Sequence, residues 1–139
     1  MNKENYINHI QERTRGTLLE ALGIEITDIG EQFISGKMPV DNRTKQPFGL
    51  LHGGASVALA ETLGSIGGGL QIDEETQSVV GIDINASHLK SVSTGWVYGK
   101  ANAVRIGKTI QVWEIVITDQ NQNLVCKSRL TLAVIKKDK

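Results

Sequence analysis

The sequence has one cysteine, Cys126, three scattered histidines and no excess of either charge, with 15 acidic and 15 basic residues. A single thiol cannot form an internal disulfide or a multi-cysteine zinc site, and the histidines lack ligand spacing. A neutral chain without a basic run gives no electrostatic reason to bind nucleic acid or a membrane surface. We therefore expect no metal, no cofactor and no nucleic-acid partner.

A targeting or membrane-spanning segment is also missing. The first residues, MNKENYINHIQERTRG, are mostly polar and lack the apolar centre of a signal peptide. The run from Pro47 to Leu70 has nearly the length of a membrane span, but it contains His52, Glu61 and seven glycines. The expectation is a soluble, reduced, cytoplasmic protein.

The residue pattern predicts one α+β domain over residues 1–139, with a polar lead-in at about 1–15 and a charged tail at 136–139. Thr17 and Glu20 fit a capping box that starts a short helix, and Gly23 stands at its stop position. Pro39 is expected to end pairing in the second strand. Strands are expected at about 24–29, 32–38, 79–89, 95–106, 109–118 and 124–135.

A long apolar helix is expected from about Gly53 to Ile66, closed by the glycines at 67–69. Because no helix interrupts the last four strands, they must pair largely antiparallel. A helix that is apolar on nearly every side must be wrapped by the sheet and covered by something else. Small residues at three- and four-residue spacing indicate a second subunit on one helix face: Ala55, Ala58, Thr62 and Ser65.

The stretch from Gln46 to Ile72 contains the candidate chemistry. It reads QPFGLLHGGASVALAETLGSIGGGLQI, and Glu61 is its only formally charged residue. A carboxylate loses hydration free energy when it leaves water, so a lone one in an apolar run has a partner or a task. By itself, Glu61 also fits a structural carboxylate paired with another chain, and His52 also fits a capping histidine.

Residues 41–65, DNRTKQPFGLLHGGASVALAETLGS, closely resemble the central segment of hotdog-fold acyl-CoA thioesterases of the 4-hydroxybenzoyl-CoA thioesterase type with a catalytic glutamate. The resemblance runs from about Leu22 to Ile135 and includes VVGIDINASHLK and QVWEIVITDQ. It is strongest to the branches that hydrolyse 1,4-dihydroxy-2-naphthoyl-CoA in menaquinone synthesis and that proofread enterobactin synthesis. It implies an antiparallel sheet wrapped around one long helix, hydrolysis of an aromatic acyl-CoA, and a homotetramer built as a dimer of dimers.

The resemblance also implies residue roles. The backbone N–H of Gly53 polarises the thioester oxygen, at a helix start whose unpaired N–H groups and dipole favour an oxyanion. Gln46 orients the thioester, and His52 supports the helix start. Glu61 either attacks the carbonyl carbon or activates water, and both routes stay open. A non-catalytic acyl-CoA binding protein of the same fold has no need of this carboxylate, and the histidine pattern of a hotdog dehydratase is not seen.

Helix geometry adds an argument that does not depend on the family. Gly53 and Glu61 are eight positions apart, or roughly 12 Å at about 1.5 Å per residue, so one thioester cannot readily touch both on one helix. Two antiparallel helices related by a two-fold axis bring each Glu61 beside the other subunit's Gly53. We expect a shared site, with Ser65 following Glu61 by one turn on the same face.

The remaining substrate contacts rest mainly on resemblance. The neutral lining of the helix face and of the loop from Gln46 to Leu51 suits a flat hydroxylated aromatic acyl group, with a broad-range enzyme or a carrier-bound aryl substrate as alternatives. Lys90 stands where the family often has arginine, which removes a bidentate phosphate contact. The expected substrate-binding residues are Ser65, Thr62, Gly81, His88, Lys90, Ser91, Arg105, Gly107, Lys108 and Thr109.

Overall fold

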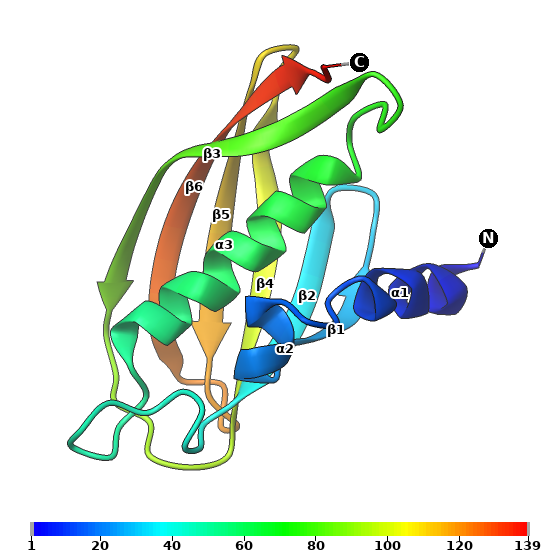
Figure 1. The fold of residues 1–139 in the computed structure, drawn as a ribbon. Coiled ribbons are helices and arrows are strands. Elements are labelled where there is room, and N and C mark those ends of the chain that lie inside the picture. The colour runs from blue at the N-terminus through cyan, green and yellow to red at the C-terminus, as the bar shows by residue number, and fades with distance from the viewer. Residues whose placement is uncertain (1, 139) are drawn as a thin grey trace.

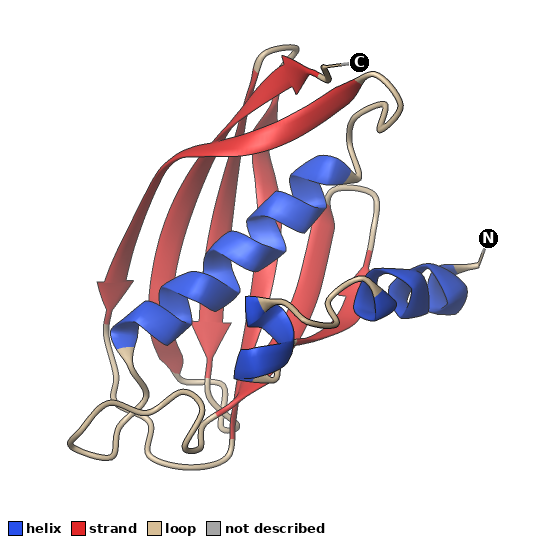
Figure 2. Ribbon diagram, viewed as in Figure 1, coloured by secondary structure: helices blue, strands red, loops and turns tan. Residues whose placement is uncertain are grey.

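The computed structural model describes residues 2–138, and its main element is a six-stranded sheet in the order β1-β2-β4-β5-β6-β3. All neighbouring strands are antiparallel, as expected. The sheet curves around one long helix, α3 (Gly53–Gly69), which lies along its concave face (Figures 1 and 2). The strands are β1 (Glu25–Ile29), β2 (Phe33–Pro39), β3 (Gln77–His88), β4 (Trp96–Ile106), β5 (Ile110–Thr118) and β6 (Leu124–Lys136).

The polar lead-in, for which the sequence pattern predicted no regular element, contains a regular helix, α1 (Lys3–Glu12). The Asn2 side chain caps it by accepting the Asn5 N–H at 2.8 Å. Gln11 then fastens α1 to the sheet edge, because its amide donates to the Ile24 carbonyl at 3.1 Å and accepts the Ile26 N–H at 2.9 Å. Tertiary hydrogen bonds, which local sequence does not reveal, therefore hold this helix in place.

The second helix, α2 (Leu18–Leu22), begins and ends where expected, but the predicted capping box is wrong. Thr17 has the extended backbone of an N-cap, yet its hydroxyl donates to the Thr14 carbonyl at 2.5 Å and caps no helical N–H. Gly23 ends the helix with a left-handed backbone, φ 74°, as its position predicted.

The prediction that three glycines close the long helix is also wrong, because α3 continues through Gly69. A Cβ on Gly67 would lie 3.0 Å from the Trp113 ring, and one on Gly68 would lie 2.5 Å from Leu132 Cδ1. These glycines remain helical because the helix needs them to lie close to strands β5 and β6. Their conformational freedom, which predicted a break, is outweighed by packing.

A buried hydrogen-bond chain joins the same end of α3 to the sheet. Gln111 is fully buried and donates from Nε2 to the Gly68 carbonyl at 3.3 Å. Its Oε1 accepts the indole N–H of Trp113 at 2.9 Å. Trp113 is fully buried. The two hydrogen bonds therefore satisfy polar groups of two buried side chains and also anchor the helix.

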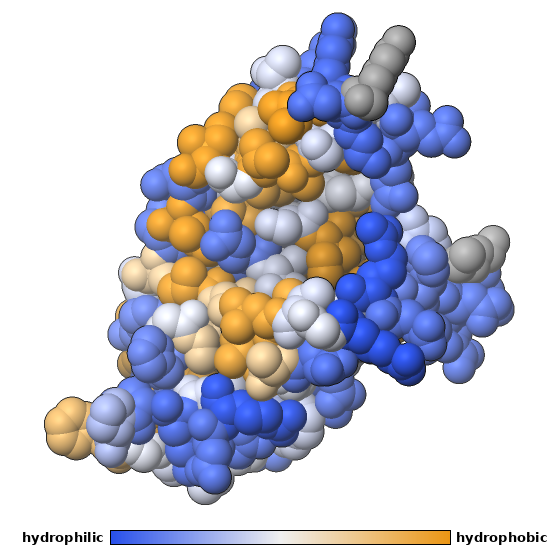
Figure 3. Space-filling view, viewed as in Figure 1, coloured by the Kyte–Doolittle hydropathy of each residue, from blue (hydrophilic) through white to orange (hydrophobic). Residues whose placement is uncertain are grey.

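The opposite face of α3 is only half covered. Ala58, Thr62 and Ser65 lie there as predicted, but Ala55 is buried against the sheet side and does not belong to this face. Next to it, the edge strand β3 leaves Val80 44% and Ile82 56% exposed. Figure 3 shows apolar side chains gathered over this side of the molecule. Within residues 2–138, no helix is both long and apolar enough to cross a bilayer.

We predict opposite stability effects for two adjacent alanine substitutions. Gly69→Ala should raise the free energy of unfolding by up to about 1 kcal/mol, because nothing lies within 4 Å of a Cβ there and alanine favours helix. Gly68→Ala should lower it by roughly 1–3 kcal/mol through overpacking against fully buried Leu132 and Gln111. Urea denaturation measures both, and shifts of the same sign would contradict this packing account.

Candidate functional site

The start of α3 is shaped by a histidine cap. His52 has an extended backbone, and its Nδ1 accepts the Gly54 N–H at 2.7 Å. Its carbonyl accepts the N–H groups of Ala55 and Ser56 at 3.0 and 3.2 Å. The Gly53 N–H has no hydrogen-bond acceptor within residues 2–138. The helix start therefore presents an unpaired donor at its positive dipole end.

This donor lies in a hollow of about 400 Å³ that we call the Gly53 cavity. A Cβ at Gly53 would lie 3.0 Å from His88 Nε2, so a side chain here would displace the imidazole. The structure brings five predicted site residues together in this cavity: Gln46, Gly53, His88, Lys90 and Ser91.

The Gln46 side chain is oriented by its own loop. Its Oε1 accepts the Phe48 N–H, and its carbonyl accepts the Gly49 N–H at 2.9 Å, which closes a turn through Pro47. Its amide NH₂ group donates to no described residue. A fixed amide with an uncommitted donor can orient a substrate carbonyl.

Glu61 lies in a second hollow of about 500 Å³ on the outer face of α3, the Glu61 groove. A Cβ at Gly81 would lie 2.8 Å from Glu61 Oε2, so the glycine on β3 makes room for the carboxylate. No cation of residues 2–138 forms an ion pair with Glu61. The groove is lined by Leu18, Leu19, Gly54, Val57, Ala58, Glu61, Thr62, Ser65 and Ile66.

Gln46 and Gly53 therefore stand in one hollow, and Glu61, Thr62 and Ser65 in another on the same helix. Separate sites on one helix are what the roughly 12 Å spacing predicted. A single chain does not bring the carboxylate to the unpaired Gly53 N–H.

Four predicted substrate contacts lie at the other end of the sheet: Arg105, Gly107, Lys108 and Thr109. Arg105 lies in the last part of β4, and the other three form the turn from β4 to β5, far from the start of α3 (Figure 1). Gly107 has a turn role, since its N–H donates to the Ile110 carbonyl at 2.8 Å. Within one chain, the length of β3 separates them from His88, and their role in substrate binding stays a prediction.

Lys90 is already paired with an acidic partner. Its Nζ lies 2.9 Å from Oδ2 of Asp119, whose side chain is 9% exposed. The Lys90 ammonium holds the pKa of the Asp119 carboxyl well below its usual range, and the Asn123 N–H acts in the same direction. This pair ties the segment after β3 to the turn between β5 and β6.

Sequence reasoning missed Ser56 in the Gly53 cavity and Leu18 and Leu19 in the Glu61 groove. Ser56 follows Gly53 by three positions, a helical spacing that could have found it. The two leucines reach α3 only through the tertiary position of α2, for which no local signal exists.

Cys126 is fully buried on β6, and burial raises the pKa of its thiol, which disfavours a nucleophilic role. Trp96 is half-buried under Lys37, whose Nζ lies 4.3 Å from the ring centroid. In the part of the chain that the structure describes, no three His, Cys, Asp or Glu side chains group as metal ligands would.

Residues 48–126, more than half of the chain, match the model of the family described as the thioesterase superfamily. The chain belongs to this family. The thioesterase is 53% identical over 86% of its length to the proofreading thioesterase EntH of Cronobacter turicensis, of which 87% is covered. It is 48% identical over 86% of its length to the 1,4-dihydroxy-2-naphthoyl-CoA hydrolase of Escherichia coli, of which 88% is covered.

A crystal structure of a thioesterase from Haemophilus influenzae superposes on this thioesterase with a TM-score of 0.90 and 48% identity, covering 94% of this chain and 90% of that one. These matches confirm the hotdog fold and the resemblance recognised in residues 41–65. The reaction is hydrolysis of a thioester.

We predict that Asp119→Asn destabilises the thioesterase at neutral pH and that this deficit shrinks in acid. The folded-state pKa of Asp119 lies below its unfolded value of about 3.9, so the ionised pair stabilises the fold above that pH and loses its effect as pH falls. Melting temperatures at pH 7, 5 and 3 measure the difference, with Glu31→Gln as an exposed control. An equal deficit at pH 7 and pH 3 would rule out the ionised pair as its cause.

Proposed function

We propose that this thioesterase hydrolyses 1,4-dihydroxy-2-naphthoyl-CoA, an aromatic acyl-CoA of menaquinone synthesis. The observation that supports this is the Glu61 groove, whose other lining residues are uncharged and whose hydroxyls come from Thr62 and Ser65. A flat hydroxylated acyl group fits such a lining better than a charged short acid, which would need a cation. The similarity to a hydrolase named for this substrate supports the same choice.

A second candidate is the removal of aryl groups from a carrier protein. The similarity to a proofreading thioesterase, at 53% identity, favours it. The same groove would bind the aryl group, and only the carrier arm would differ.

The proposed active site is shared between two chains related by a two-fold axis. One chain supplies Gln46 and the capped helix start at Gly53, and its neighbour supplies Glu61 with Thr62 and Ser65. The support is the placement of these groups in separate hollows of each chain together with the half-covered face of α3. The exposed apolar side chains of edge strand β3 suit the same interface. A dimer of such dimers is the proposed assembly, and the cytoplasmic location stays a prediction.

Within this site, the unpaired Gly53 N–H donates a hydrogen bond to the thioester oxygen as negative charge develops on it, and the Gln46 amide orients the acyl group. In one route, the Glu61 carboxylate takes a proton from water as the water oxygen bonds to the carbonyl carbon. The C–S bond then breaks, the sulfur takes the proton, and free acid and CoA leave. In the other route, a Glu61 oxygen attacks the carbonyl carbon, the C–S bond breaks and the CoA thiolate leaves with a proton from solvent. Water then cleaves the resulting anhydride, which releases the free acid and regenerates the Glu61 carboxylate. His52 acts by holding the helix start through Gly54.

The pantetheine arm would leave through the Gly53 cavity past His88 and Ser91. Lys90 can meet a phosphate only by sharing its charge with Asp119. Arg105, Lys108 and Thr109 could reach the same nucleotide only from a neighbouring chain. A weakly held nucleotide is consistent with this arrangement.

We predict that Glu61→Ala abolishes hydrolysis of 1,4-dihydroxy-2-naphthoyl-CoA without loss of fold, since no cation among residues 2–138 forms an ion pair with Glu61. Glu61→Asp should keep a trace of activity, because moving the oxygen by about an ångström can cost on the order of 100-fold. A thiol-trapping dye measures the CoA that is released.

Glu75→Ala, at an exposed acidic residue outside the site, is the matched control for this experiment. Substantial turnover by folded Glu61→Ala would remove Glu61 from the mechanism. The same assay on aryl-CoA, fatty acyl-CoA and aryl-carrier thioesters ranks the substrates by kcat/KM. A clear preference for fatty acyl-CoA would overturn the aromatic assignment and leave thioester hydrolysis standing.

We also predict that mixing two inactive variants, Glu61→Ala and Gln46→Ala, restores part of the activity. A mixed dimer with a shared site contains one site in which both residues are intact. Subunit exchange is confirmed first with differently tagged chains. If exchanged dimers stay inactive, each chain must assemble its site alone.

A further inference from the structure

One buried hydroxyl has no hydrogen-bond partner in the chain. Of the six polar residues that are buried among residues 2–138, five have side chains hydrogen-bonded to other residues. The sixth is Ser56, which is 2% exposed and whose hydroxyl bonds to no described residue. Buried polar groups are normally paired, so this hydroxyl needs an explanation. The five satisfied residues are Thr14, Thr44, Gln111, Asp119 and Ser128.

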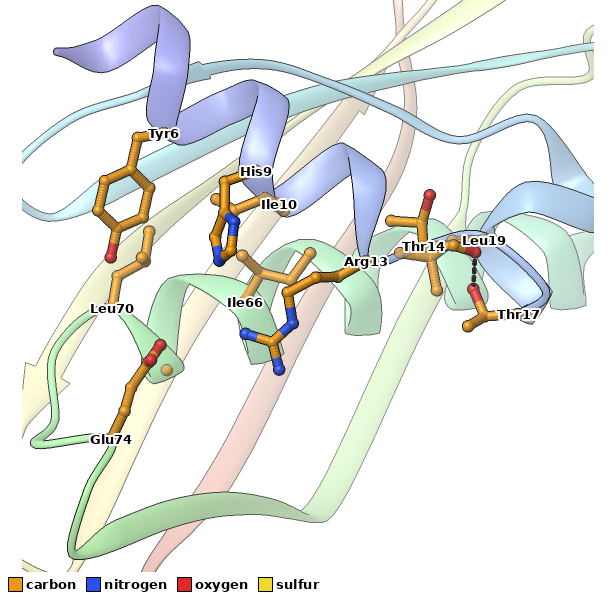
Figure 4. Close-up of a pocket in the computed structure, with 11 residues that line it drawn as sticks. Tyr6, His9, Ile10, Arg13, Thr14, Thr17, Leu19, Ile66, Leu70 and Glu74 are labelled. Atoms are coloured by element: carbon orange, nitrogen blue, oxygen red, sulfur yellow. Dashed lines mark hydrogen bonds between the residues drawn. The ribbon is translucent and has the colours of Figure 1, made fainter. Parts of the chain in front are cut away.

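Hydroxyls elsewhere in the molecule show the usual arrangement. Figure 4 shows a hollow of about 480 Å³ between α1, α2 and the last turn of α3, where the Thr17 hydroxyl donates to the Thr14 carbonyl. The Thr14 hydroxyl in turn donates to the Gln11 carbonyl at 2.7 Å. Even hydroxyls that line a hollow are therefore bonded within the chain, and Ser56 differs from them.

The Ser56 hydroxyl opens into the Gly53 cavity. Ser56 lines this cavity together with Gly53 and His88. Within residues 2–138, every enclosed side-chain nitrogen or oxygen atom has a partner, so the unpaired Ser56 oxygen is not enclosed and faces the cavity. Helical side chains lean toward the N-terminus of their helix, which directs this hydroxyl over the turn that begins at Gly53. An O–H and an N–H, both unpaired, therefore face one hollow, roughly 4.5 Å apart along α3 at about 1.5 Å per residue.

The fold has no use for this hydroxyl. Alanine, the residue before it at position 55, is a better helix former and leaves no polar atom to satisfy. The hydroxyl of Ser56 adds no hydrogen bond within the chain. A polar group that costs stability and faces a cavity beside an unpaired backbone donor points to a ligand atom as its partner.

The thioester sulfur is the atom that lacks a donor. The Gly53 N–H and the Gln46 amide already serve the carbonyl side of the thioester, and the pantetheine arm, which begins at the sulfur, leaves through the Gly53 cavity. Oxygen and sulfur are bonded to the same carbon, so an oxygen held by Gly53 places the sulfur in the same cavity. A hydroxyl hydrogen rotates freely and can follow the charge that develops there.

We propose that Ser56 is a further catalytic residue, whose hydroxyl donates a hydrogen bond to the sulfur as the C–S bond breaks. In both routes described above, the electron pair of that bond passes to sulfur, and the hydroxyl stabilises the thiolate while keeping its own proton. The proton that completes the CoA thiol comes from the attacking water or from solvent, as in those routes. The proposal rests on the proposed function only in placing the sulfur in the Gly53 cavity.

The test compares two leaving groups on one acyl group. Ser56→Ala should lower kcat for benzoyl-CoA by about 10- to 100-fold and leave KM unchanged, because a hydrogen bond to a charged group strengthens only as the charge forms. The 4-nitrophenyl thioester of the same acid releases a thiolate that its own ring stabilises. Its kcat should fall less than about threefold, since a thiol of low pKa leaves readily without help.

Ser128→Ala is the matched control. Ser128 is also 2% exposed, but its hydroxyl donates to the Asn85 carbonyl at 2.7 Å. This variant should lower the melting temperature and leave the kcat ratio of the two thioesters unchanged. Ser56→Ala should leave the melting temperature unchanged or raise it, and Ser56→Cys, which keeps a weaker donor, should give an intermediate kcat.

Two outcomes would overturn the role at sulfur. A raised KM with unchanged kcat in Ser56→Ala would mean that the hydroxyl only binds the pantetheine arm. Equal losses for both leaving groups would mean that it does not act on the sulfur. If the enzyme prefers another acyl group, the same pair of leaving groups is compared on that group, so a failure of the aromatic assignment remains distinct from a failure of this proposal.

Discussion

The close contact between α3 and the concave face of the sheet is the constraint on which the rest of the structure depends. Leu63, fully buried on the helix, fits between Gly36 and Gly99, which face each other across β2 and β4. A Cβ on either glycine would lie within 2.9 Å of a Leu63 methyl group. Glycines on both helix and sheet therefore set how near the helix lies, and that depth decides which of its residues remain accessible.

One consequence is the division of the site. Because the sheet buries one side of α3, the residues left accessible form a stripe on the other side, and Glu61 stands in its middle. The helix start is oriented differently, since His52 and the preceding loop direct the Gly53 N–H into another hollow. Because α3 is rigid, it cannot bend to bring the Glu61 carboxylate and the Gly53 N–H together. The chemistry of a thioesterase therefore favours a second copy of the same helix.

A second consequence concerns the segment before the sheet. Without α1 and α2, the end of α3 would face water. These two helices lie beside it and form a hollow with it. Lys3, Gln11 and Thr14 supply the polar contacts that hold this cover. The N-terminal segment thus shapes the space beyond the carboxylate, although the motif that identifies the family lies elsewhere in the chain.

The sequence by itself determined the antiparallel strands, the long helix, the left-handed Gly23 and the family, because alternation, helical spacing and the segment around Glu61 are local signals. It also predicted that Gly53 and Glu61 cannot meet on one helix. Only the tertiary structure decided that Gly67–Gly69 stay helical, that Thr17 caps nothing, and that Lys90 is already paired with Asp119. The reason is physical: each of these outcomes depends on a partner distant in sequence or on the packing of another element. Local propensity, which is worth about 1 kcal/mol or less per residue, yields to such contacts.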